Sequence, residues 1–399
     1  MKIYLFALTT IVLTACSKGK EDPTRPPAGL IGKMSLKLKT SSTESFFISG
    51  KNLLINWGDG EKTEIVSADQ QNISHTFTSP REYQVTITGT DINRFHIFSG
   101  SLTEIDVREN PSLVSFQCTD GQLTAIDVTR NAYLSGLMLD RNKLTQLDVT
   151  KNPLLGYLTL AGNAVQTIDL SNCPKLGVLS VVKNNLTSLN ISLHTSLMRL
   201  NCDSNRLGSL DVSKNTRLLG LTVRSCALTQ LDISNNKKLT GLDVSGNQLT
   251  ELNVMENVLL EQLECAANRL KTIDVSRQPA LSWLFCASNQ ISNLDVTHNP
   301  GLVQFDCQNN QITTLDLSQN TKLIYFYSGR NQLKALDLSK DTALKQVTCS
   351  NNLFTADALN SLFKTLHNKN ISREISITGN PGAASCDRSI ATAKGWEFN

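Results

Sequence analysis

Ten cysteines are the residues of this sequence with the most evident chemistry, because thiols form disulfides, bind metals or act as nucleophiles. Six of them are separated by multiples of 21 residues: Cys118, Cys202, Cys265, Cys286, Cys307 and Cys349. The same position in other segments holds leucine or valine, at Leu139, Leu160, Val181, Val223 and Val244. A residue that is interchangeable with leucine and valine acts as a small buried hydrophobe. The pattern therefore predicts free, buried thiols rather than disulfides or a metal site.

A second periodic set is acidic and recurs once in most segments: Asp106, Asp127, Asp148, Asp169, Asp211, Asp232, Asp274, Asp295, Asp316 and Asp337. Stacked carboxylates repel one another unless they are paired or hydrogen-bonded. Calcium binding is one explanation. The alternative is that each aspartate accepts hydrogen bonds from turn amides, or pairs with a nearby cation such as Lys151, Lys214 or Arg277. The glycine-rich calcium-binding repeat is absent, which favours the alternative.

Aromatic residues make up only 6% of the chain, yet four of them fall on outward positions in its C-terminal half. They form a candidate ligand-binding group with polar neighbours: Trp283, Phe285, Gln304, Asp306, Tyr325, Tyr327 and Glu264. Aromatic side chains with polar surroundings are typical of binding hot spots, and aromatic faces also stack on sugar rings. The alternative is that a cap or an outer loop covers them.

The elements that position these residues follow from a repeat of 21 residues without a slip. Twelve units begin at Leu102, Leu123, Leu144, Val165, Leu186, Leu207, Leu228, Leu249, Leu270, Ile291, Ile312 and Leu333. Each reads approximately L-T-x-L-D-V-S-x-N-x-x-L-x-x-L-x-C-x-x-N-x. Self-similarity at a fixed period is the signature of a solenoid. The fourth and sixth positions of L-x-x-L-x-C point inward, and the third, fifth and seventh point to solvent.

An asparagine follows most of these strands and predicts a buried amide ladder that bonds turn backbone of the next coil. Its members are Asn142, Asn163, Asn184, Asn205, Asn247, Asn268, Asn289, Asn310, Asn331 and Asn352. Gly121 and Cys226 interrupt the ladder.

Two half-repeats of ten and eleven residues fill each unit, as L-T-x-L-D-V-S-x-N and L-x-x-L-x-C-x-x-N. Over residues 102–353 this resembles the IRREKO class of bacterial leucine-rich repeats. The resemblance implies extended segments on both sides of a short turn, with little or no helix.

Residues 33–100 alternate between apolar and polar positions, which is typical of strands. The motifs Trp57-Gly58-Asp59-Gly60 and His75-Thr76-Phe77 resemble those of the PKD-like domain, a small immunoglobulin-like sandwich. The glycine that this family usually has before the tyrosine is missing at Tyr83, so the sequence predicts the sandwich but not the exact geometry of the hairpin there. One histidine and one aspartate make no metal-ligand set, so Asp59 and His75 are interpreted as a turn residue and a packed strand residue.

The N-terminus has Lys2, an apolar run over residues 3–15, and the motif Leu13-Thr14-Ala15-Cys16. The run is too short to cross a bilayer and has the layout of a secretory signal. The motif resembles the lipobox of bacterial lipoproteins. That resemblance implies a signal peptide over residues 1–15 and a lipid-modified Cys16 that anchors the chain to a membrane.

The residues after the lipobox-like motif indicate in which membrane, and on which side of it, the protein is expected. In lipoproteins, Ser17 rather than aspartate favours the outer membrane, and the stretch Lys18-Gly19-Lys20-Glu21-Asp22 resembles a signal for exposure on the cell surface. Residues 16–32 are expected to be a disordered tether, since several prolines follow.

Residues 354–399 are expected to form an α/β cap, because an open solenoid end exposes apolar surface and strand edges. Leu359, Leu362, Phe363 and Leu366 have helical spacing, and Thr355 is a plausible N-cap. The expected fold is thus mainly β: a leucine-rich-repeat solenoid of twelve coils after a small β-sandwich and before this cap.

The sequence carries no nucleophile–base pair, phosphate loop or metal cluster, and its formal net charge of +3 gives no reason to expect nucleic acid. We therefore expect a monomeric, non-enzymatic binding protein without a cofactor, used for protein recognition or adhesion. A surface glycan-binding protein for nutrient capture and a structural envelope spacer are the alternatives.

Overall fold

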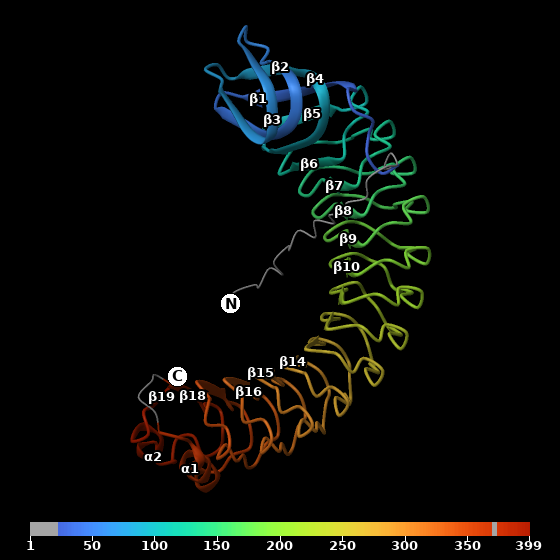
Figure 1. The fold of residues 1–399 in the computed structure, drawn as a ribbon. Coiled ribbons are helices and arrows are strands. Elements are labelled where there is room, and N and C mark those ends of the chain that lie inside the picture. The colour runs from blue at the N-terminus through green and yellow to red at the C-terminus, as the bar shows by residue number, and fades with distance from the viewer. Residues whose placement is uncertain (1–22, 369–372) are drawn as a thin grey trace.

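The computed structural model describes residues 23–368 and 373–399. The predicted signal peptide, Cys16 and the proposed export signal lie outside the described residues. The chain forms an arc of stacked coils with an N-terminal module at one end and a small helical cap at the other (Figure 1). Strands hold 29% of the residues and helices 4%, which confirms the predicted mainly β class.

Five antiparallel strands build the N-terminal module, in which β1 pairs with β4 and β5, and β2 pairs with β3 and β4. Their bounds are β1 Ile31–Thr40, β2 Thr43–Asn56, β3 Lys62–Thr76, β4 Arg81–Phe98 and β5 Leu102–Asp106. The expected alternation holds in β1, where every second residue from Gly32 onward is buried. Trp57, Phe46 and Phe95 pack in its core.

The module shares one sheet with the solenoid. The last residues of β4 pair in parallel with β6 (Ser115–Thr119), with Arg94 opposite Ser115 and Phe98 opposite Thr119. The rings of Phe95 and Phe116 stack at 6.4 Å across this junction. The module therefore covers the first coil and leaves it no open strand edge, which would invite pairing with other chains.

The solenoid sheet continues through fourteen strands, β6 to β19, each parallel to the next. After β6 they are β7 Gly136–Met138, β8 Tyr157–Thr159, β9 Val178–Ser180, β10 Arg199–Asn201, β11 Gly220–Thr222, β12 Gly241–Asp243, β13 Gln262–Glu264, β14 Trp283–Phe285, β15 Gln304–Asp306, β16 Tyr325–Tyr327, β17 Gln346–Thr348, β18 Arg373–Ser376 and β19 Trp396–Phe398. The twelve predicted repeats supply β6 to β17, and the start of the first repeat also forms β5, which pairs with β1 of the N-terminal module. The cap adds two strands, giving about 14 turns.

The core is a column of inward side chains with one layer per coil. Leu263 in β13 and Cys265 directly after it are fully buried, and their equivalents one coil on, Leu284 and Cys286, are also fully buried. Each layer packs against the layers above and below it, so burial of apolar surface accumulates coil by coil. The predicted inward direction of the fourth and sixth positions is confirmed.

The predicted asparagine ladder is present, but it bonds the preceding coil rather than the next. Asn184 accepts a hydrogen bond from the backbone N–H of Val165 (3.0 Å) and donates to the carbonyl of Leu160 (2.9 Å). It also donates to the carbonyl of Val181 in its own coil (3.1 Å). One buried amide thus satisfies three backbone groups that would otherwise be costly to bury.

The residue before each ladder position has a left-handed backbone conformation. Non-glycine residues there have φ between 50° and 61°: Asp120, Arg141, Lys183, Ser204, Ser225, Ala267, Ser288, Asn309, Arg330 and Asn351. This conformation costs about 1–2 kcal/mol for a residue with a Cβ atom. It turns the chain sharply after the strand and aims the ladder amide into the coil.

A second amide ladder follows the other half-repeat and was not predicted. Its members are Asn110, Asn131, Asn152, Asn215, Asn236, Asn257, Asn299 and Asn320, all fully buried. Asn236, for example, donates to the carbonyls of Val212 and Asn215 in the preceding coil (both 3.0 Å). The signal was available, because the N of L-D-V-S-x-N recurs with the same period. Cys173, His194, Gln278 and Asp341 substitute for asparagine in this ladder.

The cap contains the predicted helix, α1 (Ala356–Thr365), and a short α2 (Ser389–Thr392). Thr355 caps α1, since its side chain accepts a hydrogen bond from the N–H of Ala358 (3.2 Å). Leu359, Leu362 and Phe363 are buried against the last coils. Among the described residues, neither helix has the length and apolar character needed to cross a bilayer.

Candidate functional site

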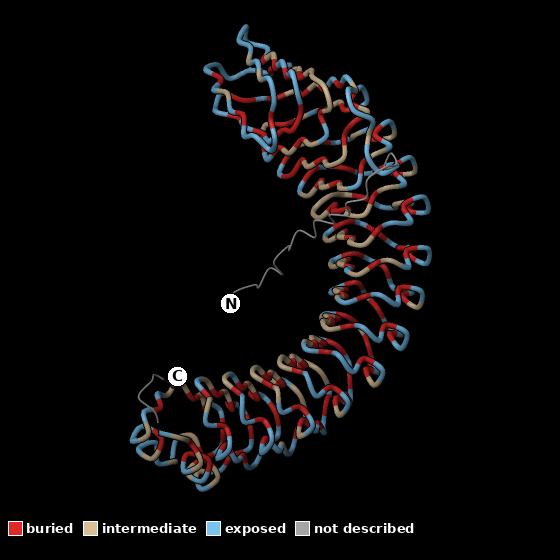
Figure 2. The backbone as a smooth tube through the Cα atoms, viewed as in Figure 1, coloured by how far each residue is buried: buried red, intermediate tan, exposed pale blue. Residues whose placement is uncertain are grey.

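The strands line the inner, concave side of the arc, and short loops form its outer side (Figure 1). Figure 2 shows that the inner strands are buried or partly buried, whereas exposed residues concentrate on the outer loops. The third and fifth strand positions face the concave side and keep part of their surface exposed, as the burial pattern of β13 to β15 shows.

The structure brings the seven predicted site residues together on this concave side. One row runs from Trp283 through Gln304 to Tyr325 on neighbouring strands. The second row runs along the fifth positions, in the order Glu264, Phe285, Asp306 and Tyr327. All seven side chains keep part of their surface exposed, and Tyr325 is 37% exposed. Among the described residues, Trp283, Phe285 and Tyr327 are partly buried and Tyr325 is exposed.

Polar contacts fix the orientation of part of this group. The Tyr327 hydroxyl donates to Oε1 of Gln346 (2.8 Å), whose amide nitrogen donates to Oε2 of Glu374 (3.2 Å). Asp306 accepts hydrogen bonds from the backbone N–H of Gln308 (3.0 Å) and from its side-chain amide (3.2 Å). Burial nevertheless raises the pKa of Asp306 above its ordinary value.

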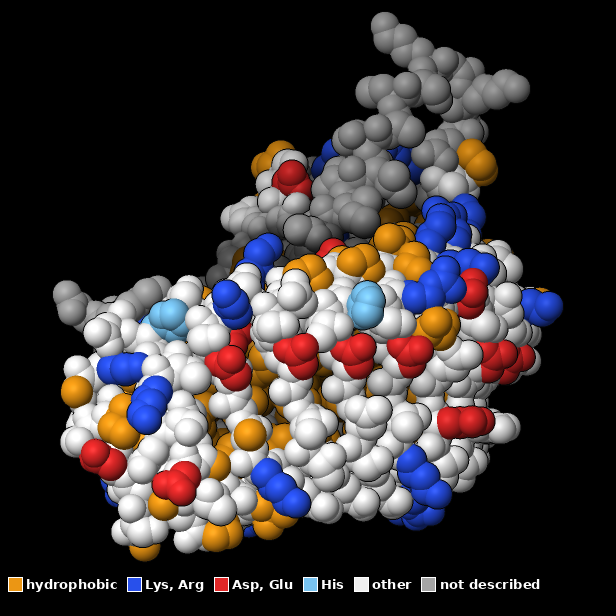
Figure 3. Space-filling view, turned by 90° about the horizontal axis from the view of Figure 1, so that it is seen from below, with side chains coloured by type: hydrophobic (Ala, Val, Ile, Leu, Met, Phe, Trp, Pro, Cys, Tyr) orange, Lys and Arg blue, Asp and Glu red, His pale blue; other side chains and the backbone are white. Residues whose placement is uncertain are grey.

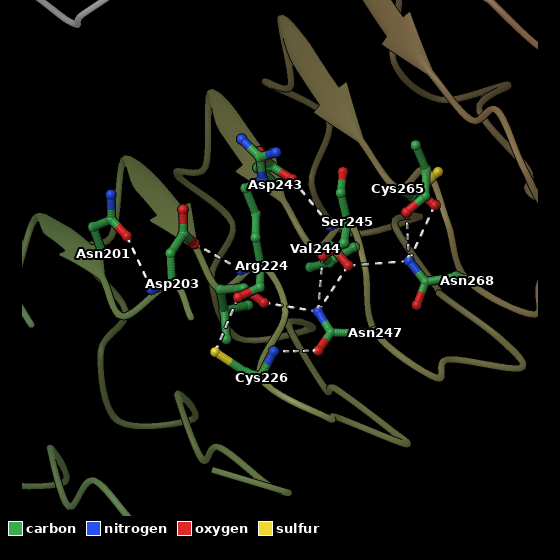
Figure 4. Close-up of polar contacts among 12 residues, drawn as sticks. Asn201, Asp203, Arg224, Cys226, Asp243, Val244, Ser245, Asn247, Cys265 and Asn268 are labelled. Carbon is green, nitrogen blue, oxygen red and sulfur yellow. Dashed lines mark hydrogen bonds and ion pairs between the residues drawn. The ribbon is translucent and has the colours of Figure 1, made fainter. Parts of the chain in front are cut away.

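An acidic group on and after β10 to β13 combines the predicted Glu264 with Asp203 and Asp243, which were not predicted; Figure 4 shows Asp203 and Asp243 near Arg224. Asp243 lies directly opposite Glu264 on the next strand. Nε of Arg224 lies 3.5 Å from Oδ2 of Asp243, and the backbone N–H of Arg224 donates to Oδ1 of Asp203 (2.7 Å). Burial, followed by the charge of Asp243, raises the pKa of Glu264 to about 7. Burial also raises the pKa of Asp203 to about 6.

A smaller aromatic–acidic pair in the N-terminal half was also missed. Tyr157 holds the third position of β8 and is half-buried, and burial followed by the charge of Asp140 raises its pKa. Asp140 accepts hydrogen bonds from Oγ1 of Thr159 (3.0 Å) and from the N–H of Ala161 (2.7 Å). The signal for Tyr157 was the same strand position that identified Trp283.

The periodic aspartates lie on the surface, where acidic side chains form a row across the coils (Figure 3). Each accepts a hydrogen bond from the N–H two residues later, as Asp274 does from Ser276 (2.9 Å) and Asp295 from Thr297 (2.8 Å). The N–H of Ser276 lowers the pKa of Asp274. The turn-amide interpretation is thus confirmed. In the described parts of the chain, no three His, Cys, Asp or Glu residues are grouped so that they could hold a metal ion.

Asp59 and His75 form a local contact of the N-terminal module. Oδ1 of Asp59 accepts from the N–H of Glu61 (3.0 Å), and Nε2 of His75 lies 2.6 Å from Oδ2 of Asp59. The imidazole stacks on Trp57 with ring centroids 4.6 Å apart. This is the predicted arrangement of a turn aspartate and a packed strand histidine.

All nine described cysteines are free, and every one except Cys386 is buried. Burial raises the pKa of the thiols of Cys118, Cys265 and Cys349 to about 12. Because the thiolate is the reactive form, these thiols are inert near neutral pH. The predicted role as small buried hydrophobes is confirmed.

Neither a family model nor a curated protein matches the sequence. Among solved structures, the functional domain of InlJ from Listeria monocytogenes, which includes a cysteine ladder, is 31% identical. The match covers 73% of this chain and 76% of that one, with a TM-score of 0.60. The internalin InlF from Listeria monocytogenes str. 4b F2365 is 20% identical, with 78% and 88% covered and a TM-score of 0.58.

A third similar structure, YopM from Yersinia enterocolitica WA-314, is 21% identical, with 69% and 62% covered and a TM-score of 0.54. At this identity YopM and InlF support the fold alone. The period, the inward leucines and cysteines, and the identity to the InlJ domain agree: this chain belongs to the family of leucine-rich-repeat proteins.

Proposed function

We propose that this chain is a lipid-anchored cell-surface protein that recognises a protein partner with the concave side of its solenoid. The observation that carries the proposal is the register of β13 to β16, which gathers Trp283, Phe285, Tyr325 and Tyr327 on one partly exposed surface. Aromatic side chains contribute large contact area at small entropic cost, and they are enriched in binding hot spots.

The absence of loops inserted between the repeats supports binding rather than catalysis. The 21-residue period holds through all twelve units, so the concave side is a regular sheet surface. A rigid, open sheet surface suits a macromolecular partner, and curved solenoids commonly bind on their concave side.

A glycan is the second candidate ligand. Trp283 and Tyr325 hold the same strand position two coils apart, so they lie about 10 Å from each other on one side of the sheet. Two aromatic residues at this separation could each stack on a sugar ring of one chain. The polar groups of Gln304, between them, could then bond sugar hydroxyls.

The first experiment separates these ligands. The double variant Trp283→Ala/Tyr325→Ala and the control Tyr133→Ala, which changes a tyrosine in a turn between β6 and β7, are compared with the native chain on a glycan array and in a cell-binding assay. We expect binding to protease-sensitive sites on cells, lost in the double variant and retained in the control. Binding that is unaffected by the double variant contradicts the proposal, and binding only to glycans supports the second candidate.

The anchoring part of the proposal rests on the lipobox-like motif that ends at Cys16. Two or more acyl chains on Cys16 would hold the protein firmly at a membrane. Metabolic labelling with an alkyne fatty acid should label the native chain but not Cys16→Ser. Protease treatment of intact cells should remove the protein if it is exposed on the surface, and protection from the protease contradicts surface exposure.

A further inference from the structure

The concave surface of β10 to β18 has a charge opposite to that of the whole chain. Its third, fifth and seventh strand positions hold five acidic residues and two basic residues, in a chain whose formal net charge is +3. The acidic residues are Asp203, Asp243, Glu264, Asp306 and Glu374, and the basic residues are Arg199 and Arg224. The acidic residues share this surface with Trp283, Phe285, Tyr325 and Tyr327, and we call these nine the acidic–aromatic face.

Arg224 neutralises only part of this charge. Its guanidinium reaches Asp243 at 3.5 Å, and its side chain remains 54% exposed. Asp203 is bonded to the backbone N–H of Arg224 rather than to its guanidinium (Figure 4). An exposed pair at this distance contributes little, because solvent screens it. Arg224 therefore neutralises little of the charge of Asp203, Asp243 and Glu264.

The carboxylates of this face are partly removed from water. The side chain of Asp243 is only 13% exposed, and Glu264 lies beside it on the adjacent strand. Burial and the neighbouring Asp243 carboxylate raise the cost of ionising Glu264, as its raised pKa reflects. A cation that docks between them removes this cost, so the free face has a built-in preference for positive charge.

Carboxylates and aromatic rings alternate along the fifth strand positions, in the order Glu264, Phe285, Asp306 and Tyr327. Neighbouring strands are about 4.8 Å apart, so each carboxylate lies within one side-chain width of an aromatic ring. A guanidinium can pair with the carboxylate and stack on the ring at the same time. The alternation repeats once, which matches two cationic side chains on one partner segment.

We propose that the acidic–aromatic face binds a protein segment that presents arginine or lysine side chains, two of which dock at Glu264–Phe285 and at Asp306–Tyr327. This inference rests on the proposed role in protein recognition and adds the chemistry of the partner. The aromatic rings provide apolar contact area, and the carboxylates select for positive charge and speed the encounter.

The test is a random peptide display library selected on the immobilised full-length chain. We expect arginine and lysine to be enriched in the retained peptides relative to the input library. A synthetic peptide of the enriched sequence should lose about tenfold or more in affinity for Glu264→Gln/Asp306→Asn. The control Asp274→Asn removes a surface carboxylate outside the acidic–aromatic face and should leave the affinity unchanged. Thermal melting of each variant shows that it is folded.

The outcomes separate this inference from the proposed function. Retained peptides without enriched basic residues, whose binding is lost in Trp283→Ala, overturn the cationic partner and leave protein recognition standing. Basic peptides that bind Glu264→Gln/Asp306→Asn as tightly as the native chain also overturn it. If no peptide is retained and the glycan array is positive, both the inference and the proposed function are wrong.

Discussion

Asp341 occupies in its coil the position that Asn320 occupies in the preceding coil, but the Asn320 amide can donate hydrogen bonds, whereas an ionised carboxylate can only accept them. The Asn320 amide donates to the carbonyls of Val296 and Asn299 (both 2.9 Å). Both carboxylate oxygens of Asp341 lack a hydrogen-bond partner, although the residue is only 2% exposed. Burial, followed by the charge of Asp337, raises the pKa of Asp341 to about 7.

Replacement of Asp341 by asparagine should stabilise the C-terminal coils, and more so at pH 8 than at pH 5. A carboxyl with a raised folded pKa makes the chain less stable as the pH rises from the ordinary value of 3.8 to about 7, because the unfolded chain releases the proton first. Asp341→Asn removes this pH-dependent loss of stability and restores an amide N–H donor at this position. We expect a gain of about 2–4 kcal/mol at pH 8.

Urea unfolding at the two pH values measures this difference through the transition midpoint. The control is Asp316→Asn, which changes the equivalent exposed carboxylate of the preceding coil, where it accepts from the N–H of Ser318 (2.8 Å). The burial argument fails if Asp341→Asn gains no more at pH 8 than at pH 5.

The first amide ladder should be far more sensitive to substitution than its exposed neighbours. Asn184→Ala removes the partners of the Val165 N–H and the Leu160 carbonyl, both of which stay buried. We expect a loss of about 2–4 kcal/mol, because unpaired buried polar groups carry their full desolvation cost. Asn185→Ala changes the adjacent, exposed asparagine and should cost about 0.5 kcal/mol or less. Equal losses measured by thermal melting would refute this role for the ladder.

The repeat period alone was sufficient to predict the fold and the direction of the inward side chains. Leucine, valine and cysteine exchange at one position only if that position is buried and apolar, so the state of Cys286 followed directly. Asn236 was harder to interpret, because a periodic asparagine can cap an exposed turn as well as join a buried ladder. The choice depends on how the second half-repeat stacks, which the period does not specify.

The candidate site was predictable where a single strand position decided it. Trp283 and Tyr325 share the third position, and parallel register then placed them on one surface. The acidic group needed more information, because Asp203 and Asp243 lie two coils apart at different strand positions. Their proximity depends on how far Arg224 and the turn backbone reach between coils, which only coordinates provide.

The left-handed residue before each ladder amide should accept glycine with a gain in stability. Ala267 has a φ of 53°, and glycine holds the equivalent position at Gly246. We expect Ala267→Gly to stabilise the chain by about 0.5–1 kcal/mol, because relief of the left-handed conformation outweighs the added freedom of the unfolded chain. Ala266→Gly, at a neighbour without positive φ, should instead cost about 0.5–1 kcal/mol. A loss in both variants would contradict the strain argument.

The buried thiols should be protected from alkylation until the solenoid unfolds. Cys286 is fully buried, and burial holds its pKa well above the ordinary value, whereas Cys386 in the cap is partly exposed. Mass spectrometry after brief maleimide treatment at pH 7 should find Cys386 modified and Cys286 unmodified, and both modified in guanidinium chloride. Cys286→Val should change stability by less than about 1.5 kcal/mol, since Val244 fills the equivalent position two coils earlier. Rapid modification of Cys286 in the native chain would mean that neighbouring coils separate readily, and the stacked core could not then act as the rigid support that the concave face requires.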